Sequence, residues 1–405
     1  MTTTKRFDHR RALLKSGLAA LGAQGLGVPL LFNNAAHAAA SQDNRILVVL
    51  EMSGGNDGLN TVVPYADDAY YRLRPTIGLK PAKLRKIDDH FGFSPGTAGF
   101  ETLYKNGQMA IVHGCGYDNP SFSHFTSMAY WHTAAPNSGQ EHGWVGRLAD
   151  QLKPAGARNY LVNIDSTQSL AVRSVRHTPV VFDDPVKFQR ASFYQERDYI
   201  DRVADPAQAG SDSLRYLRNV ATSAKDASAL VREAWARYKT PVDYGIIPVD
   251  LTKVAALIDA GLPTRLFYVA YRNNAFDTHV HQGDLHQRLL TYVSDAVYGF
   301  MRDMERIGRA DDVVLLAFSE FGRRVAENTS LGTDHGTAGP MFIFGKPVKG
   351  GHHGQPVSLT QLHPDGNLIH TADFRRTYAT LIEGWLGAES KTLLGGDFAP
   401  FPVFG

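Results

Sequence analysis

The chain has 405 residues, of which 43% are hydrophobic and 20% charged, so it can bury a sizeable core and does not have the composition of a disordered chain. Lysine and arginine number 42 against 40 acidic residues, and the formal net charge is +2. So small an excess of positive charge cannot neutralise a phosphate backbone, and we therefore expect no nucleic acid partner.

Residues 1–40 have the three zones of an export signal. A basic start containing Arg10 and Arg11 leads into an apolar stretch at 13–32, and small residues follow it. A charged residue and a proline interrupt the apolar stretch, which indicates a cleavable signal rather than a membrane span. The arginine pair resembles the twin-arginine signal. We therefore expect the twin-arginine export machinery as a partner, a periplasmic or otherwise exported protein, and no stable membrane span in the mature chain.

Short apolar runs alternate with stretches of helical period in the rest of the chain. The runs predict buried strands at 46–51, 109–113, 160–164, 266–271, 313–318 and 341–344. The periodic stretches predict helices at 121–134, 144–153, 194–204, 212–238, 252–261, 281–307 and 373–386. This alternation predicts an α/β fold with a mainly parallel central sheet and helices on both faces. We expect a single domain over 44–405, with a helical insertion or cap around 183–245.

A glycine-rich turn follows the first predicted strand and holds Asn56 and Asp57. Glycines let the backbone approach a ligand, and Asp57 can point out of the turn as a metal ligand, with Asn56 as a candidate substrate-binding residue. The alternative is a tight turn in which Asp57 is only a cap. The glycine spacing is neither the dinucleotide-binding nor the P-loop pattern, so it gives no support to a nucleotide cofactor.

A helix start follows the second predicted strand. Pro120 and Ser121 indicate this start, with Ser121 as the cap. A hydroxyl there lies at the positive end of the helix dipole, which favours a lowered pKa and a bound anion. Ser123 is therefore a candidate nucleophile, and His124 a candidate for orienting it or acting as an acid. The alternatives are a serine that only caps the helix and a histidine on the helix face.

Metal-ligand residue types follow the strand predicted at 266–271. Asp277, His279 and His281 lie within five residues of one another, a spacing that suits Zn²⁺ or Mn²⁺ because both ions accept carboxylate oxygen and imidazole nitrogen. The alternative is a carboxylate that caps the next helix and histidines on its surface.

Two more segments supply similar residues. Glu320 follows the strand predicted next along the chain, and a later loop holds Asp334 and His335. Arg323 and Arg324 could bind an anionic group of a substrate. Because catalytic groups of α/β folds gather beyond the carboxyl ends of the strands, we expect these side chains to converge. Carboxylates and imidazoles without thiolates indicate a catalytic or substrate-binding metal rather than a closed structural zinc site.

Seven motifs together resemble the DUF1501 family, over nearly the whole chain from Arg45 to the end. They are Gly-Gly-Asn-Asp-Gly-Leu-Asn-Thr-Val-Val-Pro at 54–64, Ser-His-Phe at 123–125, Gly-Trp-Val-Gly-Arg at 143–147, Phe-Asp-Thr-His-Val-His-Gln at 276–282, Ser-Glu-Phe-Gly-Arg-Arg at 319–324, Gly-Thr-Asp-His-Gly-Thr-Ala at 332–338 and Asp-Phe-Arg-Arg-Thr-Tyr-Ala-Thr-Leu at 373–381. This family resembles a distant branch of the alkaline phosphatase and sulfatase superfamily, which implies an alkaline-phosphatase-like fold with a two-metal site.

The resemblance also implies residue roles. Ser123 is similar to the nucleophile of that superfamily. The implied metal ligands are Asp57, Asp277 with His279 or His281, and His335. Glu320 falls where the superfamily has the aspartate of an Asp-His pair, and Phe321 takes the place of its histidine. That change could leave a single metal, move a ligand to Asp334, or abolish metal binding.

The resemblance implies an exported hydrolase of phosphate or sulfate esters, dependent on a divalent metal such as Zn²⁺ or Mn²⁺ and acting through a serine nucleophile on a small anionic ester. The alternative is a catalytically inactive exported scaffold or binding protein that keeps the same fold.

Overall fold

The structure is a computed structural model that describes residues 44–153, 159–188 and 227–405. Residues Arg45–Gly405 group into one compact unit by their contacts. The predicted export signal and the helix predicted at 194–204 lie outside the described residues, as does much of the predicted insertion. Of the helix predicted at 212–238, the described part is helical over 227–237.

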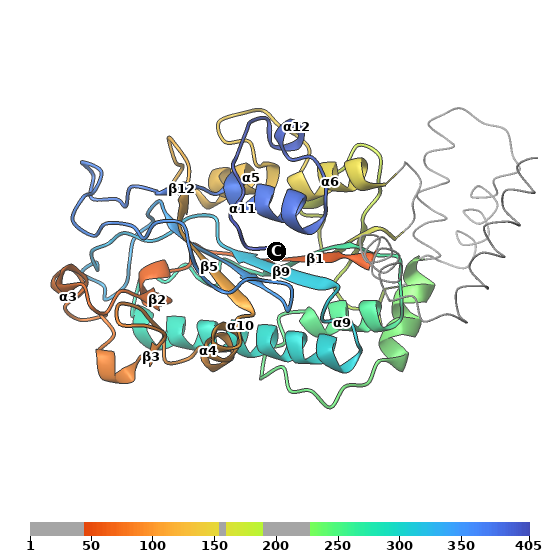
Figure 1. The fold of residues 1–405 in the computed structure, drawn as a ribbon, viewed down its shortest axis with the longest axis horizontal. Coiled ribbons are helices and arrows are strands. Elements are labelled where there is room, and N and C mark those ends of the chain that lie inside the picture. Colours follow the sequence, from red (N-terminus) through yellow and green to blue (C-terminus); the bar gives the residue numbers. More distant parts are fainter. Residues whose placement is uncertain (1–43, 154–158, 189–226) are drawn as a thin grey trace, which may run out of the picture. The chain divides into compact units, whose positions relative to one another are not determined.

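A nine-stranded sheet runs through the described part of this unit (Figure 1). Its order is β11-β5-β10-β9-β1-β8-β6-β7, and β12 pairs with β5. The strands are β1 (Ile46–Met52), β5 (Met109–Gly116), β6 (Leu161–Ile164), β7 (Val180–Phe182), β8 (Leu266–Tyr271), β9 (Val313–Phe318), β10 (Gly339–Phe344), β11 (Gly351–His353) and β12 (Ala372–Asp373). Within the sheet as described, β10 is antiparallel to both neighbours and the other pairings are parallel. The predicted mainly parallel sheet is confirmed.

Helices cover both faces of the sheet, as the alternating pattern predicted (Figure 1). One layer holds α4 (Ala98–Lys105), α9 (Leu251–Asp259) and α10 (Gln282–Arg306). The other holds α5 (His124–Thr133), α6 (Trp144–Leu152), α11 (Arg375–Ala379) with the π-helical turn Thr380–Trp385, and α12 (Lys391–Leu394). Among the described residues, no helix combines the length and the apolar character needed to cross a membrane.

Smaller elements lie beside this framework. A three-stranded sheet has the order β2-β4-β3, formed by β2 (Val62–Val63), β3 (Arg85–Lys86) and β4 (Gly92–Phe93), and α3 (Asp68–Leu73) follows β2. Short 3₁₀ turns lie at Gly58–Asn60, Pro81–Lys83 and Leu170–Val172. The sequence did not predict the small sheet because two-residue strands have no measurable period.

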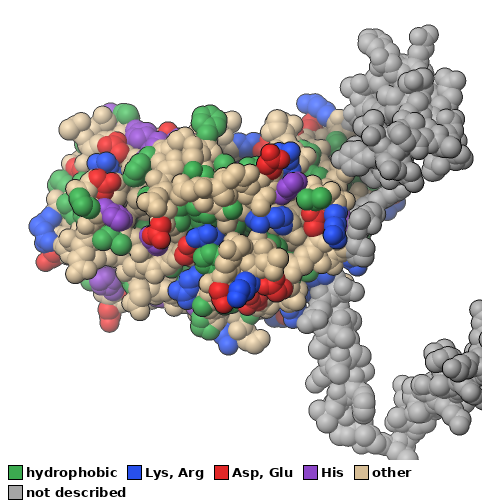
Figure 2. Space-filling view, turned by 90° about the horizontal axis from the view of Figure 1, so that it is seen from above, with side chains coloured by type: hydrophobic (Ala, Val, Ile, Leu, Met, Phe, Trp, Pro, Cys, Tyr) green, Lys and Arg blue, Asp and Glu red, His purple; other side chains and the backbone are tan. Residues whose placement is uncertain are grey.

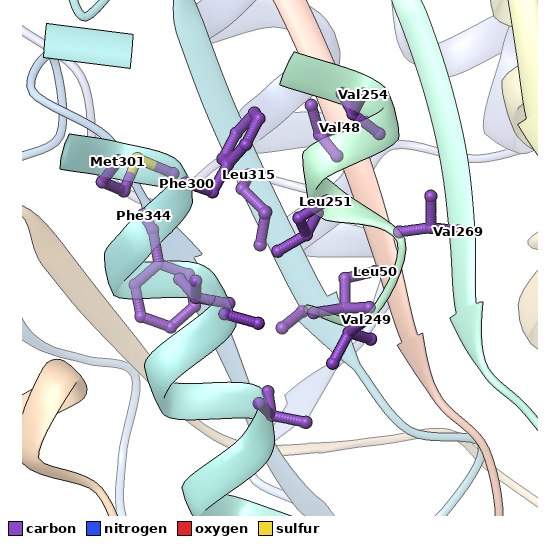
Figure 3. Packing of buried hydrophobic residues seen from close by; sticks show 14 of the residues in the cluster. Val48, Leu50, Val249, Leu251, Val254, Val269, Phe300, Met301, Leu315 and Phe344 are labelled. Atoms are coloured by element: carbon purple, nitrogen blue, oxygen red, sulfur yellow. The ribbon is translucent and has the colours of Figure 1, made fainter. Parts of the chain in front are cut away.

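Strand β1 divides the core into two halves because successive side chains of a strand point to opposite faces. Val48 and Leu50 belong to the cluster on the α9 and α10 side, whereas Leu47 and Val49 belong to the cluster on the α5 and α6 side. Figure 3 shows Val48 and Leu50 packed with residues of α9, α10 and neighbouring strands. Full burial on both faces explains why this strand is a continuous apolar run.

The register of β1 determines where the site lies. Glu51 is opposite Phe318 at the end of β9, and Met52 is opposite Tyr271 at the end of β8. The segments that follow these three parallel strands therefore leave the sheet at the same edge, as expected for an α/β fold.

Candidate metal centre

Three side chains from separate segments converge near this edge. His124 begins α5, Asp277 lies in the loop after β8, and His335 lies in the loop between β9 and β10. Each offers a ligand atom within 4.8 Å of the other two. Nε2 of His124 is 3.3 Å from Oδ2 of Asp277, and Nε2 of His335 is 3.1 Å from Oδ1 of the same carboxylate. Two imidazoles and one carboxylate are a common ligand set for zinc and other divalent transition metals.

In each histidine of this group, Nδ1 forms a hydrogen bond with another part of the protein. Nδ1 of His335 donates to the backbone oxygen of Phe122 at 2.7 Å. Nδ1 of His124 is 2.8 Å from Oε1 of Glu320, and because a carboxylate only accepts, the nitrogen donates. Both Nε2 atoms are then unprotonated in the neutral rings, and Nε2 of His124 is buried without a hydrogen-bond partner. Histidines that bind metals are held in this way.

Glu320 is anchored behind His124 by the turn after β1. The backbone nitrogen of Gly54 lies 2.9 and 3.0 Å from its two carboxylate oxygens, and that of Gly55 lies 3.0 Å from Oε2. Ser319 donates to Oε2 at 3.0 Å. Gly54 has φ 118°, and a Cβ there would lie 2.5 Å from the backbone nitrogen of Asp277. Only glycine fits, so the turn forms an anion-binding nest of amide donors.

Glu320 was predicted to be a metal ligand, but the structure places its carboxylate outside the group of ligand atoms. Both oxygens are engaged by amide and hydroxyl donors, and the side chain is fully buried. Glu320 therefore orients His124 and lies behind the group of ligand atoms.

Electrostatics favour a carboxylate and at least one neutral imidazole in the group. Burial opposes ionisation of Asp277, but the hydrogen bond and charge of Arg323 outweigh it and lower the pKa of this carboxyl. Burial lowers the pKa of His335, which favours the neutral ring that a metal requires. The hydrogen bond that His124 donates to Glu320 raises the pKa of His124, against the effect of burial. A proton and a metal ion would therefore compete for His124.

Arg323 positions Asp277. Its side chain is fully buried, and Nη2 lies 2.7 Å from Oδ1 of Asp277. It also donates to the backbone oxygens of Gly55 at 2.6 Å and Thr333 at 2.9 Å, and to those of Gly54 and Phe276. These contacts join the segments after β1, β8 and β9. Arg323 was predicted to bind substrate, but its donors are directed at the protein, and Arg324 is exposed.

His279 and Asp334 lie at the side of the group. Nε2 of His279 is 2.9 Å from both Nε2 of His335 and Oδ1 of Asp277. Nδ1 of His279 is 3.3 Å from Oδ1 of Asp334. His279 is therefore placed to act as a further ligand, with Asp334 supporting it. His281, also predicted as a ligand, is exposed at the start of α10 and lies outside the group.

Asp57 and Asn56 contact other protein groups and not the ligand atoms of His124, Asp277 and His335. Oδ2 of Asp57 forms a buried ion pair with Arg74 at 2.6 Å and accepts from Gln282, while Oδ1 is buried without a partner. Burial opposes ionisation, but Arg74 outweighs it and the pKa of Asp57 is lowered. Asn56 turns inward to Thr61. Asp57 does not belong to the metal-capable group found among the described residues.

Ser123 caps α5. Its Oγ accepts from the backbone nitrogen of Thr126 at 3.5 Å, and the residue is exposed. The cap predicted at Ser121 is therefore wrong, because the helix begins later and Ser123 is its cap. The hydroxyl of Ser123 remains open to solvent beside His124.

Exposed hydrophobic residues flank the group. Phe125 is 90% exposed and follows His124, and Val280 is 57% exposed and follows His279. Figure 2 shows one face of the molecule, on which hydrophobic side chains are interspersed with charged ones and histidines.

Sequence reasoning missed the supporting contacts. The backbone oxygen of Phe122 and the amides of Gly54 and Gly55 carry no side-chain signature, although the paired glycines indicated a special turn. Arg74 was missed because its partnership with Asp57 depends on the packing of α3, which no local pattern reveals.

Comparison with known proteins gives one family and several remote structural likenesses. A family model described as "Protein of unknown function (DUF1501)" matches residues 44–396. No curated protein matches the sequence significantly.

Among solved structures, the C-terminal periplasmic domain of EcEptC from Escherichia coli, in complex with Zn, has 12% identity and a TM-score of 0.34, with 74% of this chain and 72% of that chain covered. The lipoteichoic acid synthase LtaP from Listeria monocytogenes has 10% identity and a TM-score of 0.37, covering 88% and 75%. The PsFucS1 sulfatase from Pseudoalteromonas sp. has 12% identity and a TM-score of 0.37, covering 91% and 72%. At these scores no residue correspondence follows.

Proposed function

The chain belongs to the DUF1501 family, and we propose that it is an exported, metal-dependent hydrolase of phosphate or sulfate esters that acts through Ser123. One observation carries the proposal. Unprotonated Nε2 atoms of His124 and His335 converge with Asp277 within 4.8 Å, while the other nitrogen of each ring is hydrogen bonded to the protein. Ring nitrogens and a carboxylate brought together in this way are suited to bind a cation.

The residues present fit a divalent metal. His124, His335 and Asp277 would hold it, and His279 is close enough to join them. Nitrogen and oxygen ligands without thiolate suit Zn²⁺ or Mn²⁺. When bound, such a metal supplies a Lewis acid that stabilises developing negative charge and lowers the pKa of a hydroxyl.

Ser123 supplies the nucleophile in this proposal. Its hydroxyl lies at the amino end of α5, where free amide groups and the helix dipole favour an anion. The bond from Oγ to phosphorus or sulfur forms as the bond to the alcohol oxygen breaks, and the serine proton is balanced by protonation of the departing alcohol. Water then hydrolyses the serine ester and restores the hydroxyl.

Other residues of the chain hold this arrangement. Glu320 fixes the direction of His124, and Arg323 fixes Asp277 against the turn after β1. Phe125 and Val280 are exposed hydrophobic residues next in sequence to His124 and His279, and in this proposal they would contact an apolar alcohol part of the ester.

A binding protein without catalysis is the second candidate. Arg323 places a fixed positive charge 2.7 Å from Oδ1 of Asp277, which weakens the attraction of that oxygen for a metal. The ring of Phe321 packs against His124 and His335, with centroids 5.0 and 4.7 Å apart. Phe321 stands where the superfamily has a histidine ligand, and the exposed Phe125 would suit a binding surface.

Hydrolysis of aryl phosphate and aryl sulfate esters tests the proposal. We expect the purified protein to release phenolate from one of them, a chelator to abolish this, and Zn²⁺ or Mn²⁺ to restore it. Ser123→Ala should abolish turnover, whereas Ser166→Ala, at an exposed serine on another loop, should keep it. Tight metal binding without turnover of any ester would favour the binding protein.

A further inference from the structure

A second set of histidines adjoins a cavity beside β5. The cavity has an empty volume of about 580 Å³ including its mouth, of which about 50 Å³ is wide enough for the centre of a water molecule. Its apolar walls include Leu59, Phe91, Pro340, Leu359 and Leu368, and its polar lining residues are His113 of β5, His90, Asp67 and Arg323. A narrow space with such walls suits a flat, mostly apolar molecule.

His113 is the first member of a chain of three polar side chains. Its Nε2 is 2.7 Å from Nδ1 of His352 in β11, and Nε2 of His352 is 2.8 Å from Oδ2 of Asp88. The backbone nitrogens of His90 and Phe91 donate to Oδ1 of Asp88 at 2.7 and 2.6 Å. Asp88 is therefore fixed next to His352.

This chain determines the protonation of His113. An ionised carboxylate only accepts protons, so Nε2 of His352, which faces Asp88, carries a hydrogen. In the neutral ring of His352, Nδ1 is then the acceptor, and Nε2 of His113 donates to it. Nδ1 of His113 is left as an acceptor. Within the described part of the chain it has no hydrogen-bond partner, although His113 is only 7% exposed.

The rings are held in place by their mutual hydrogen bond and by Phe91. The rings of His113 and His352 lie edge to edge and nearly coplanar, with centroids 4.9 Å apart, and Phe91 packs against both at 5.1 and 5.2 Å. Burial lowers the pKa of His113 to about 3, so the ring stays neutral near neutral pH. Nδ1 of His113 is therefore an acceptor that a ligand in the cavity can engage in place of water. The fixed ring needs little rearrangement for this contact.

We propose that this cavity binds a small, flat, mostly apolar molecule with one hydroxyl group, which donates a hydrogen bond to Nδ1 of His113. None of His124, Asp277 and His335 lines this cavity, but Arg323, which holds Asp277, does. Occupancy of the cavity does not require the proposed hydrolysis.

Phenol and anisole are matched probes because they have the same ring and differ in the hydroxyl donor. In protein labelled with ¹⁵N-histidine, phenol should shift the Nδ1 resonance of His113. Calorimetry should give phenol about fivefold tighter binding than anisole, the effect of one hydrogen bond. His113→Leu should remove this preference, and His353→Leu, whose ring instead contacts the backbone oxygen of Lys349, should retain it.

If His113→Leu does not fold, the measurements on the native protein alone test the proposal. An Nδ1 resonance of His113 that is unchanged at saturating phenol, or equal affinities of the native protein for phenol and anisole, would overturn the proposal.

Discussion

Nε2 of His279 and Nε2 of His335 lie 2.9 Å apart, and both face Oδ1 of Asp277. Because Nδ1 of His335 donates to Phe122, its neutral ring presents a lone pair at this point. Nε2 of His279 either donates a hydrogen to this lone pair or, when Nδ1 of His279 donates to Asp334, faces it with a second lone pair. In the second tautomer the two nitrogens and the carboxylate can share a metal ion.

Replacing Glu320 by glutamine should weaken metal binding without unfolding the protein. The charged hydrogen bond that directs His124 would become a neutral one, and the loss of such a supporting contact typically lowers metal affinity by about 10- to 100-fold. Titration with Zn²⁺ measures this. Glu305→Gln, the same change on the exposed side of α10, is the control. Equal affinities of native protein and Glu320→Gln would show that Glu320 does not support a ligand.

Replacing Asp57 by alanine should mainly reduce stability. Arg74 would keep a buried charge without its partner, which typically costs about 3–5 kcal/mol. Urea unfolding measures this loss, and Asp311→Ala, which breaks an exposed pair with Lys346, should cost about 1 kcal/mol or less. If Asp57→Ala instead keeps its stability and loses metal, Asp57 is a ligand.

Stability should fall as the pH falls from about 6.5 towards the pKa values of two buried histidines. Burial lowers the pKa of His113 to about 3 and that of His286 to about 4. Between these values and the ordinary value near 6.5, the unfolded chain binds more protons than the folded one, so acid favours unfolding. Urea unfolding at a series of pH values measures the slope.

His113→Leu should flatten this slope, because the variant has no imidazole to protonate at that position. His281→Leu, at an exposed histidine, should leave it unchanged. An identical slope in the native protein and His113→Leu would contradict the assignment.

Export should depend on the arginine pair. Replacing both Arg10 and Arg11 by lysine should retain the precursor inside the cell, because the twin-arginine machinery reads the pair itself and not only its charge. Fractionation of expressing cells measures this, and Lys5→Arg is a control outside the pair. Unchanged export of the double variant would argue for another route.

Sequence patterns predicted the framework better than the site. Burial on both faces makes β1, β8 and β9 continuous apolar runs that the sequence reveals. Asp277 and His335 lie close together beyond the edge that these strands share. The roles of Glu320 and Arg323 could not be read, because the sequence does not say whether a charged group faces a ligand or the backbone.

Contacts between residues far apart in the sequence could not be predicted either. His113 and His352 are 239 positions apart and meet only because β11 pairs with β5. The ion pair of Asp57 with Arg74 likewise depends on where α3 packs. Such contacts follow from tertiary structure, whereas periodicity reports only on burial and local conformation.

Equilibrium binding of Zn²⁺ and Mn²⁺ to metal-free protein is the most direct test of the metal centre. We expect at least about one tightly bound ion per chain in the native protein. Binding should be strongly weakened in His335→Ala and His124→Ala and unchanged in His281→Ala. Folded native protein that binds neither ion, or His335→Ala that binds as tightly as the native protein, would contradict the account.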